Sequence, residues 1–426
     1  MSEGQIAIPA VYLRGGSSKA MFFKEEDIPP PGLLRERVLK RVMGTPDPIQ
    51  IDGMGGTRIV TSKVAIIKAS DREDADVEYT FGQVGIAEDH IRLRGNCGNI
   101  SVGVGPFAID EGIIKKPFRK GVALDPDLQT REVRIYQTAI KRLLIAHVPV
   151  SAKSGKSISR GDFAIAGVPG TGAPILMDFR NTSAGFLNKG PLPTGTPTET
   201  IEIEGIKVPI TIVDIAQLTS FIQAKDVGVA DLASRSATSI TNDKELIARC
   251  REVRGKVAHK LGMCTNWELV DQQSPGLPSV VMVEPVRDNT VGSLGGAHIV
   301  SRFILNNMCH DGMAGTVAAA TAACSRLQGT LINTLTNGGA KSLDDPEFRI
   351  SHPLGLFHVR VEAAVDGRRA RTTPSEKPEF NVLAFVRTSR RIFEGKVYIP
   401  DDVWDGKATE STETANRSNG TNGLHD

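Results

Sequence analysis

A lysine and a cysteine, each next to glycine-rich sequence, are the residues of this chain best suited to chemistry. Lys63 directly precedes the apolar run 64–67, and Cys97 stands between two glycines and two asparagines in the segment 95–99. If the strand turns Lys63 into a cleft, lost hydration lowers its pKa and makes it a usable base; otherwise it is a solvated residue at a strand edge. A helix that begins at Cys97 would present free backbone N–H groups and a positive dipole end to the thiol. Both side chains would then be proton-transfer groups.

The residues after Cys97 predict a short buried helix. Small and apolar residues run to Gly112, a usual helix stop, although Gly103, Gly105 and Pro106 are poor helix formers. The start of such a helix also forms a cradle for a carboxylate.

A second segment follows the same pattern. The segment 314–329 has the length of the segment 97–112, and a polar turn that contains His310 precedes it. The matched pairs are Gly98 with Gly315 and Asn99 with Thr316. The match predicts two related halves, each pointing a helix N-terminus at a shared cleft, and the alternative is chance agreement between two glycine-stopped helices. Two positive helix ends would favour a substrate with several carboxylates.

Two further glycine turns could contact a ligand. The turn 14–19 combines two cations with two hydroxyls, which predicts an anion clamp if it faces a cleft and a flexible surface turn if it does not. The turn 51–58 lacks the glycine pattern and the flanking strand and helix of a dinucleotide site. Close approach of its backbone to a small ligand is the better interpretation.

The composition argues against several classes of protein. The chain has 426 residues, enough for two or three domains, and a formal net charge of +2. No basic block with interleaved aromatic residues suggests a nucleic-acid partner, and no apolar run reaches the roughly 18 residues of a membrane span. Five irregularly spaced cysteines and no signal peptide predict a reducing cytoplasm. Scattered histidines leave a metal site without support.

Many strands and few helices must position these groups, which predicts an α+β fold. Apolar periodicity predicts helices over 33–43 and 243–261. We expect strands over 6–13, 64–67, 77–84, 133–150, 201–221, 278–286, 296–304, 357–364 and 380–386, and a last hairpin over 387–398. A proline-rich linker predicts a boundary between two domains, 1–205 and 206–405, although the last strands could cross back to the first domain. The composition of 406–426 predicts a disordered tail.

Five of these segments together resemble the PrpF family. They are Arg14–Lys19, Ile51–Gly56, Thr61–Ala65, Gly95–Asn99 and Leu192–Gly195, and the similarity runs from about Ile6 to about Pro400. The family includes 2-methylaconitate cis–trans isomerase, methylitaconate and aconitate Δ-isomerases and 4-oxalomesaconate tautomerase. The resemblance implies a fold similar to diaminopimelate epimerase: two similar domains, each a β-roll or barrel around a central helix, with the active site between them.

The resemblance also implies roles for particular residues. Lys63 and Cys97 would form the acid–base pair, and neither a cofactor nor a metal would be needed. The residues expected to bind substrate are Arg14, Gly16, Ser17, Ser18, Lys19, Met54, Gly55, Ser62, Asn96, Gly98, Asn99, His310, Gly315 and Thr316.

Three positions depart from related patterns. Ala314 stands where diaminopimelate epimerase has its second cysteine, and the nearby Cys309 does not match that position. A symmetric two-thiol racemase is therefore not expected. Ser279 stands where many relatives carry a lysine, which leaves the exact substrate open.

We therefore expect a cofactor-independent isomerase of an unsaturated di- or tricarboxylic acid of the aconitate, methylaconitate or alkyl-itaconate type. Removal of an allylic proton places charge on carboxylate oxygens, and its return gives a double-bond shift or a cis–trans exchange. One alternative is a 4-oxalomesaconate-type keto–enol tautomerase. Another class is a cysteine hydrolase or acyltransferase, in which Cys97 would need His310 or His298 within reach. A third is a non-catalytic carboxylate-binding protein. The expected partner is a small polycarboxylate, and a homodimer is left open.

Overall fold

The computed structural model describes residues 3–93, 95–287, 294–336, 346–363 and 380–407. Most of the segment predicted to be a disordered tail, residues 408–426, lies outside the described residues. Among the described helices, none is long and apolar enough to cross a membrane.

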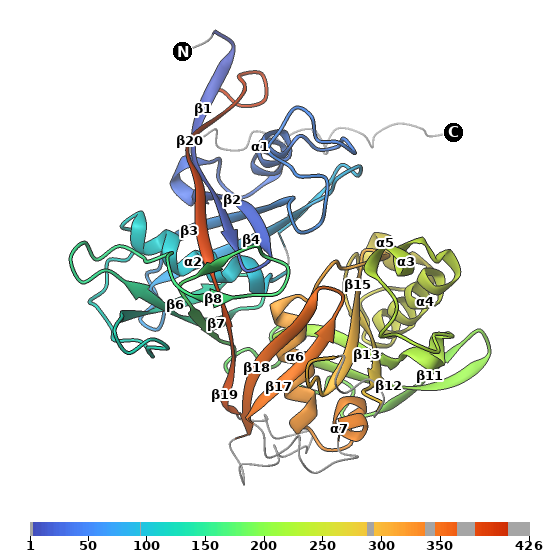
Figure 1. Cartoon of the computed structure of the whole chain (residues 1–426). Helices are drawn as coiled ribbons and strands as arrows, with labels where there is room; N and C mark the ends of the chain where they lie inside the picture. Colours follow the sequence, from blue (N-terminus) through green and yellow to red (C-terminus); the bar gives the residue numbers. More distant parts are fainter. Residues whose placement is uncertain (1–2, 94, 288–293, 337–345, 364–379, 408–426) are drawn as a thin grey trace, which may run out of the picture.

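Strands dominate the fold, which agrees with the predicted α+β class. Eighteen of them form one continuous hydrogen-bonded ladder, and two short strands pair separately. Figure 1 shows two lobes. The N-terminal lobe contains β1 (Gln5–Gly15), β2 (Ser18–Lys24), β3 (Lys63–Ala69), β4 (Val77–Val84), β5 (Ile91–Arg92), β6 (Gln129–Gln137), β7 (Arg142–Val150), β8 (Phe163–Ala164), β9 (Thr171–Gly172), β10 (Ile175–Asp178), α1 (Leu33–Met43), α2 (Gly98–Asp110) and the 3₁₀ helix η1 (Glu25–Asp27).

The C-terminal lobe contains the elements from β11 to β19. Its strands are β11 (Glu199–Ile203), β12 (Ile206–Ile215), β13 (Gln217–Gln223), β14 (Ser279–Pro285), β15 (Ile299–Leu305), β16 (Met308–Cys309), β17 (Glu347–His352), β18 (Gly355–Ala363) and β19 (Phe380–Arg387). Its helices are η2 (Ala224–Val227), α3 (Ala237–Asn242), α4 (Lys244–Lys260), η3 (Trp267–Leu269), α5 (Val270–Gln273), α6 (Gly315–Arg326) and α7 (Leu331–Thr336).

The ladder passes from one lobe to the other through β10 and β19. β10 pairs with β7 on one side and with β19 on the other, and β19 continues into β18. β20 (Ser389–Pro400) then runs back along β1 (Figure 1). The antiparallel pairing extends from Gln5 opposite Pro400 to Gly15 opposite Ser389. β11 precedes the predicted boundary at residue 205 and pairs with β12, which follows it. The boundary itself stays a prediction.

The predicted hairpin over 387–398 is wrong, because Arg387 ends β19 and residues 389–398 lie in the single long strand β20. Gly395, a residue type that often marks a turn, lies opposite Ala10 in the middle of the ladder. The pairing partner lies at the other end of the chain, so no local turn is needed.

Each lobe surrounds one buried helix. α2 contacts β1, β2, β3, β6, β7 and β20, while α6 contacts β12, β13, β18 and β19. The glycines that weaken α2 by propensity are required by packing, because a Cβ on Gly103 would lie 2.4 Å from Leu13 and one on Gly105 would lie 2.7 Å from Val148. α2 ends at Asp110, just before the predicted stop at Gly112, and α6 ends at Arg326 rather than at Gly329.

The N-terminal ends of α2 and α6 meet directly between the lobes. A Cβ on Gly98 would lie 2.7 Å from the backbone nitrogen of Thr316 and 3.0 Å from the backbone of Gly315. The two helix starts that the sequence paired therefore face one another.

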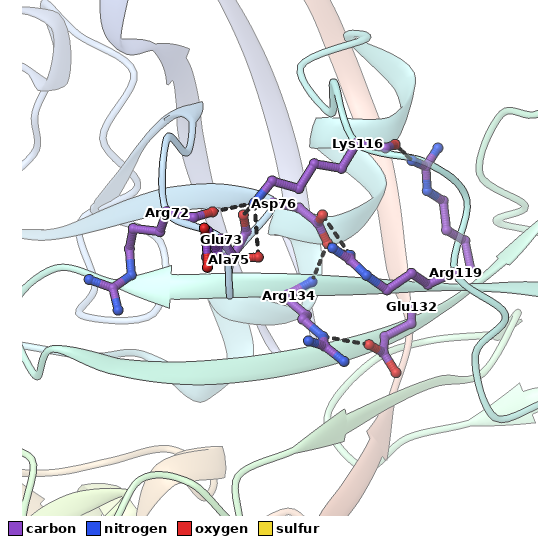
Figure 2. Close-up of polar contacts among 9 residues, drawn as sticks. Arg72, Glu73, Ala75, Asp76, Lys116, Arg119, Glu132 and Arg134 are labelled. Carbon is purple, nitrogen blue, oxygen red and sulfur yellow. Dashed lines mark hydrogen bonds and ion pairs between the residues drawn. The ribbon is translucent and has the colours of Figure 1, made fainter.

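The other end of α2 is anchored by a polar network that Figure 2 shows. The Lys116 ammonium, on the segment that follows α2, donates to backbone oxygens of the turn 72–75. Nearby, the buried carboxylate of Asp76 accepts hydrogen bonds from Arg119 at 2.7 Å and from the Arg134 backbone at 2.8 Å. These contacts tie the chain after α2 to the β3–β4 turn and to β6.

Replacing Gly98 by alanine should lower the free energy of unfolding by about 1–3 kcal/mol, because the added Cβ meets backbone atoms that cannot swing aside. Chemical denaturation of both proteins measures the difference. The matched control is Gly395→Ala, whose Cβ would meet the exposed ring of Phe393, which is free to move. Equal losses in the two variants would contradict close contact between the helix starts.

Candidate active site

A pocket opens beside the two helix starts and takes residues from both lobes. Its empty volume is about 680 Å³, including the open space at its mouth. It is lined by Lys63, Phe81, Gln83, Arg92, Gly95, Asn96, Cys97, Asn99, Phe186, Gln217, Pro275, Gly276, Leu277, Phe303, Leu305, Asn306, His310 and Ala314. The lining contains lysine and arginine but neither aspartate nor glutamate, so its charge favours an anionic ligand.

Lys63 enters the pocket from the first position of β3. Only 3% of the residue is exposed, and its ammonium lies 5.2 Å from the centre of the Phe81 ring. Burial lowers the pKa of Lys63, and the neighbouring Cys97 opposes this shift in part. The lysine is therefore held in a site that favours its neutral form.

Gln83 orients Lys63 from the neighbouring strand. The two residues are direct partners across β3 and β4, and Lys63 Nζ donates to Gln83 Oε1. Gln83 Nε2 in turn donates to the backbone oxygens of Ser62 at 3.0 Å and Ile59 at 3.2 Å, which keeps Oε1 turned toward the lysine. A neutral amide accepts this hydrogen bond without stabilising the ammonium as a carboxylate would.

Cys97 is the residue immediately before α2 and faces the same pocket. It has extended backbone angles, its side chain makes no capping hydrogen bond, and the residue is 8% exposed. Within the described residues, no group accepts from the backbone N–H groups of Gly98, Asn99, Gly315 or Thr316. Of these four residues Asn99 lines the pocket, where a free N–H at a helix start would stabilise an anion.

Two asparagine side chains in the lining have unused hydrogen-bonding groups. Asn96 Nδ2 and Asn99 Oδ1 are buried and have no partner in the described structure. The other Asn96 group, Oδ1, accepts from Ser101, and Asn99 Nδ2 donates to Ser17. Because a buried unpaired donor is unfavourable, an anionic ligand in the pocket would relieve Asn96 Nδ2, whereas Asn99 Oδ1 is an acceptor that lies against Gly16.

His310 adds a neutral imidazole to the lining. Its Nδ1 accepts from the backbone N–H of Gly312 at 3.0 Å, and its ring stacks on Phe303. Burial and the charge of Lys63 lower the pKa of His310 to about 4. The hydrogen bond to Nδ1 places the proton on Nε2, so this histidine is a donor near neutral pH.

The second cysteine and the second histidine considered above lie away from this site. Cys309 packs in the core of the C-terminal lobe, and burial raises its pKa to about 12. Ala314 occupies the pocket wall at the start of α6, where a second thiol would stand. Both ring nitrogens of His298 contact Arg349, and the residue is not part of the lining.

The remaining residues predicted to bind substrate lie outside the lining. They are Arg14, Gly16, Ser17, Ser18, Lys19, Met54, Gly55, Ser62, Gly98, Gly315 and Thr316. Two of them hold residues that do line the pocket: Ser17 accepts from Asn99 at 3.2 Å, and Thr316 donates to Gln217 at 2.9 Å.

The turn 14–19 packs against the start of α2. Arg14 donates to the backbone oxygens of Gly16 at 2.8 Å and Thr388 at 2.9 Å, and a Cβ on Gly16 would lie 2.2 Å from Asn99 Oδ1. Lys19 lies over the Tyr12 ring, 5.1 Å from its centre. Both cations of this turn therefore contact protein groups: Lys19 contacts the Tyr12 ring, and Arg14 contacts Gly16 and Thr388.

The turn 51–58 and Ser62 form a separate support behind Lys63. Ser62 donates to Gln50 Oε1 at 2.7 Å, and a Cβ on Gly55 would meet the same glutamine side chain. Met54 packs against the core formed by α1, β2 and β3.

Several lining residues were not among the predicted set. Gln83, Arg92, Gln217 and Asn306 supply its additional polar groups, and the rest are mainly apolar. Gln83 could have been suspected from its place near the end of a strand, but no motif marks the other three. Among the described residues, no group of three or more His, Cys, Asp or Glu side chains could hold a metal ion.

Comparison with known proteins gives matches along almost the whole chain. The family model described as "PrpF protein" matches residues 5–400. A 3-methylitaconate isomerase of Eubacterium barkeri is 37% identical over 93% of this chain and 98% of its own length. A 4-oxalomesaconate tautomerase of Pseudomonas putida is 33% identical over 95% of this chain and 99% of its own length. A 2-methyl-aconitate isomerase of Cupriavidus necator is 32% identical over 94% of this chain and 99% of its own length.

A solved structure agrees with these matches. The crystal structure of a methylitaconate-delta-isomerase superposes with a TM-score of 0.71 at 36% identity, and the match covers 96% of this chain and 100% of that one.

Two lysines on β3 should have pKa values on opposite sides of the ordinary lysine value. Burial lowers the pKa of Lys63, whereas hydrogen bonds and charges from Glu25 and Glu78 raise the pKa of Lys68. As pH rises, Lys63 should therefore lose its proton first, which NMR of isotope-labelled lysine side chains can follow. Gln83→Glu should raise the pKa of Lys63 and leave Lys68 unchanged, because it places a carboxylate against only one ammonium. A Lys63 that titrates together with Lys68 would show that its environment is not desolvated.

Proposed function

This chain belongs to the PrpF family and is an isomerase of unsaturated carboxylic acids, and we propose that it acts by moving a proton between substrate atoms with Lys63 and Cys97. The observation that carries the proposal is their placement in one pocket that has free hydrogen-bond donors and no carboxylate of its own. No cofactor is part of this mechanism.

The first step is removal of a proton from a carbon next to the double bond of the substrate. Neutral Lys63 can accept such a proton, and burial keeps its pKa below the ordinary value. Cys97 is the second proton-transfer group in the lining. Which of the two begins the exchange depends on the face of the substrate that each one meets.

The negative charge produced in this step spreads over the double bond to a carboxylate. The donors available for that charge are Asn96 Nδ2, Nε2 of the neutral His310 and the unpaired backbone N–H of Asn99 at the start of α2. Donors fixed in place before the reaction stabilise developing charge, each contributing on the order of 10²-fold in rate.

Return of the proton determines the product. Protonation at the far end of the delocalised system shifts the double bond, whereas protonation at the original carbon after bond rotation exchanges cis and trans forms. A keto–enol tautomerase of the 4-oxalomesaconate type would use the same two groups, and the relative with that name supports this second candidate.

The geometry gives less support to a cysteine hydrolase. His310 Nδ1 is occupied by the backbone N–H of Gly312, and within the described residues no hydrogen bond joins this histidine to Cys97 Sγ. The triad arrangement needs such a base beside the thiol and an acid that orients it.

A cytoplasmic location belongs to the same proposal, because the chemistry requires Cys97 to remain a free thiol. All five cysteines are free in the structure.

The test is proton NMR of candidate substrates in deuterated water. Methylitaconate, 2-methylaconitate, aconitate and 4-oxalomesaconate should be screened, and at least one should exchange a carbon-bound proton for deuterium and isomerise. Tight binding without any exchange would instead indicate a carboxylate-binding protein, and an acyl group on Cys97 would indicate a hydrolase.

Lys63→Ala and Cys97→Ala should each reduce turnover of the exchanging substrate by roughly 10²-fold or more, the scale of a lost acid–base group. Substrate binding should change less, because other groups hold the carboxylates. Cys309→Ala is the matched control, since it removes a buried thiol outside the pocket and should keep most of the activity. Near wild-type turnover in both pocket variants would exclude the proposed pair.

Treatment with a metal chelator should leave the isomerisation rate unchanged, because the proposed proton transfer uses no metal. The rate is measured before and after dialysis against the chelator. A loss of rate that a divalent cation restores would reveal a metal requirement.

A further inference from the structure

Arg92, at the end of β5, places a positive charge in the pocket wall without a carboxylate partner. Its Nη1 donates to Asn306 Oδ1 at 2.7 Å, and its Nε is buried with no hydrogen-bond partner. Within the described residues, neither an aspartate nor a glutamate forms an ion pair with Arg92. A partly buried cation with unused donors is unfavourable until an anion binds it.

The C-terminal lobe shapes the slot that holds this guanidinium. Asn306 lies in the turn between β15 and β16 with a φ of 51°. Its side-chain oxygen Oδ1 accepts from Arg92 across the interface between the lobes. A Cβ at Gly276 would lie 2.7 Å from Arg92 Nη1, so glycine at this position gives the guanidinium room where it now lies. The guanidinium is therefore held in position from both lobes.

A second hollow lies on the other side of Arg92. It has an empty volume of about 1070 Å³ and shares Arg92, Pro275 and Asn306 with the active-site pocket. Its other arginine, Arg254, is already paired with Asp271. Glu88 and Asp271 also line this hollow and attract Arg92 through space, but within the described residues neither forms an ion pair with it.

The active-site pocket provides a different kind of donor at the helix starts. Beside Cys97 the available donors are the neutral Asn96 amide and the backbone N–H of Asn99. These are suited to the carboxylate that takes up charge during proton transfer, because neutral donors bind a resting carboxylate less tightly than a cation does.

We propose that Arg92 binds a second substrate carboxylate, remote from the carbon that exchanges its proton. This inference rests on the proposed function. It makes Arg92 a specificity-determining residue, because an acid with only one carboxylate would leave its guanidinium without an anion. The preferred substrates are then acids with at least two separated carboxylates.

The test is calorimetric binding of two saturated acids that cannot react. Methylsuccinate has a remote carboxylate, and 2-methylbutyrate has a methyl group in its place. The wild type should bind methylsuccinate at least about tenfold more tightly, the scale of a hydrogen-bonded charge pair. Arg92→Gln should remove that difference, and Asn306→Asp should reduce it by giving Arg92 an internal carboxylate.

The control is Arg72→Gln, which removes an exposed arginine paired with Asp74 and should keep the wild-type preference. The inference is overturned if the wild type does not distinguish the two acids, or if Arg92→Gln binds methylsuccinate as tightly as the wild type. Should Arg92→Gln not fold, Asn306→Asp decides, and unchanged binding there counts against the inference. Deuterium exchange of the wild type tests the proposed function separately, since these acids bind without reacting.

Discussion

The meeting of two helix N-termini is the contact on which the site depends. α2 and α6 approach so closely that an added Cβ on Gly98 would lie 2.7 Å from the Thr316 nitrogen. Helix N-termini carry partial positive charge, so two that face one another repel unless an acceptor lies nearby. The residues at the two helix starts that line the pocket, Cys97, Asn99 and Ala314, therefore lie next to one another at the interface of the lobes.

The pocket controls its titratable groups by burial and neutral partners. Lys63 is paired with an amide, Gln83, and His310 accepts from a backbone N–H. The neighbouring Asp311 raises the pKa of His310, but burial and the charge of Lys63 outweigh it. Burial therefore lowers the pKa of both residues. The positive charge that remains, on Arg92, is left for the ligand. A site with this balance favours anions and shifts Lys63 toward the neutral amine that can accept a proton.

The continuous ladder explains how two lobes can hold such a site in position. β19 pairs with β10, and β20 then pairs with β1 along its whole length, so the end of the chain joins both lobes. Thr388, between those two strands, accepts from Arg14, whose turn packs on Asn99. The residues that the sequence suggested as an anion clamp thus support the start of α2 and link it to the closing strands.

Local spacing in the sequence was enough to predict the α+β class, most strand positions, the helices 33–43 and 243–261, and the two helices that begin after Cys97 and Ala314. The resemblance to the PrpF family placed Lys63, Asn96, Cys97, Asn99 and His310 in one predicted site, and all five line the pocket. Periodicity and turn chemistry act between near neighbours, and a chain can be read for them directly. The tertiary structure alone decided that Gln83 orients Lys63, that Arg92 and Asn306 meet across 214 positions of sequence, and that 389–400 is one strand. Those outcomes depend on which distant segments pack together, and single residues such as Arg92 carry no local pattern that records their partner.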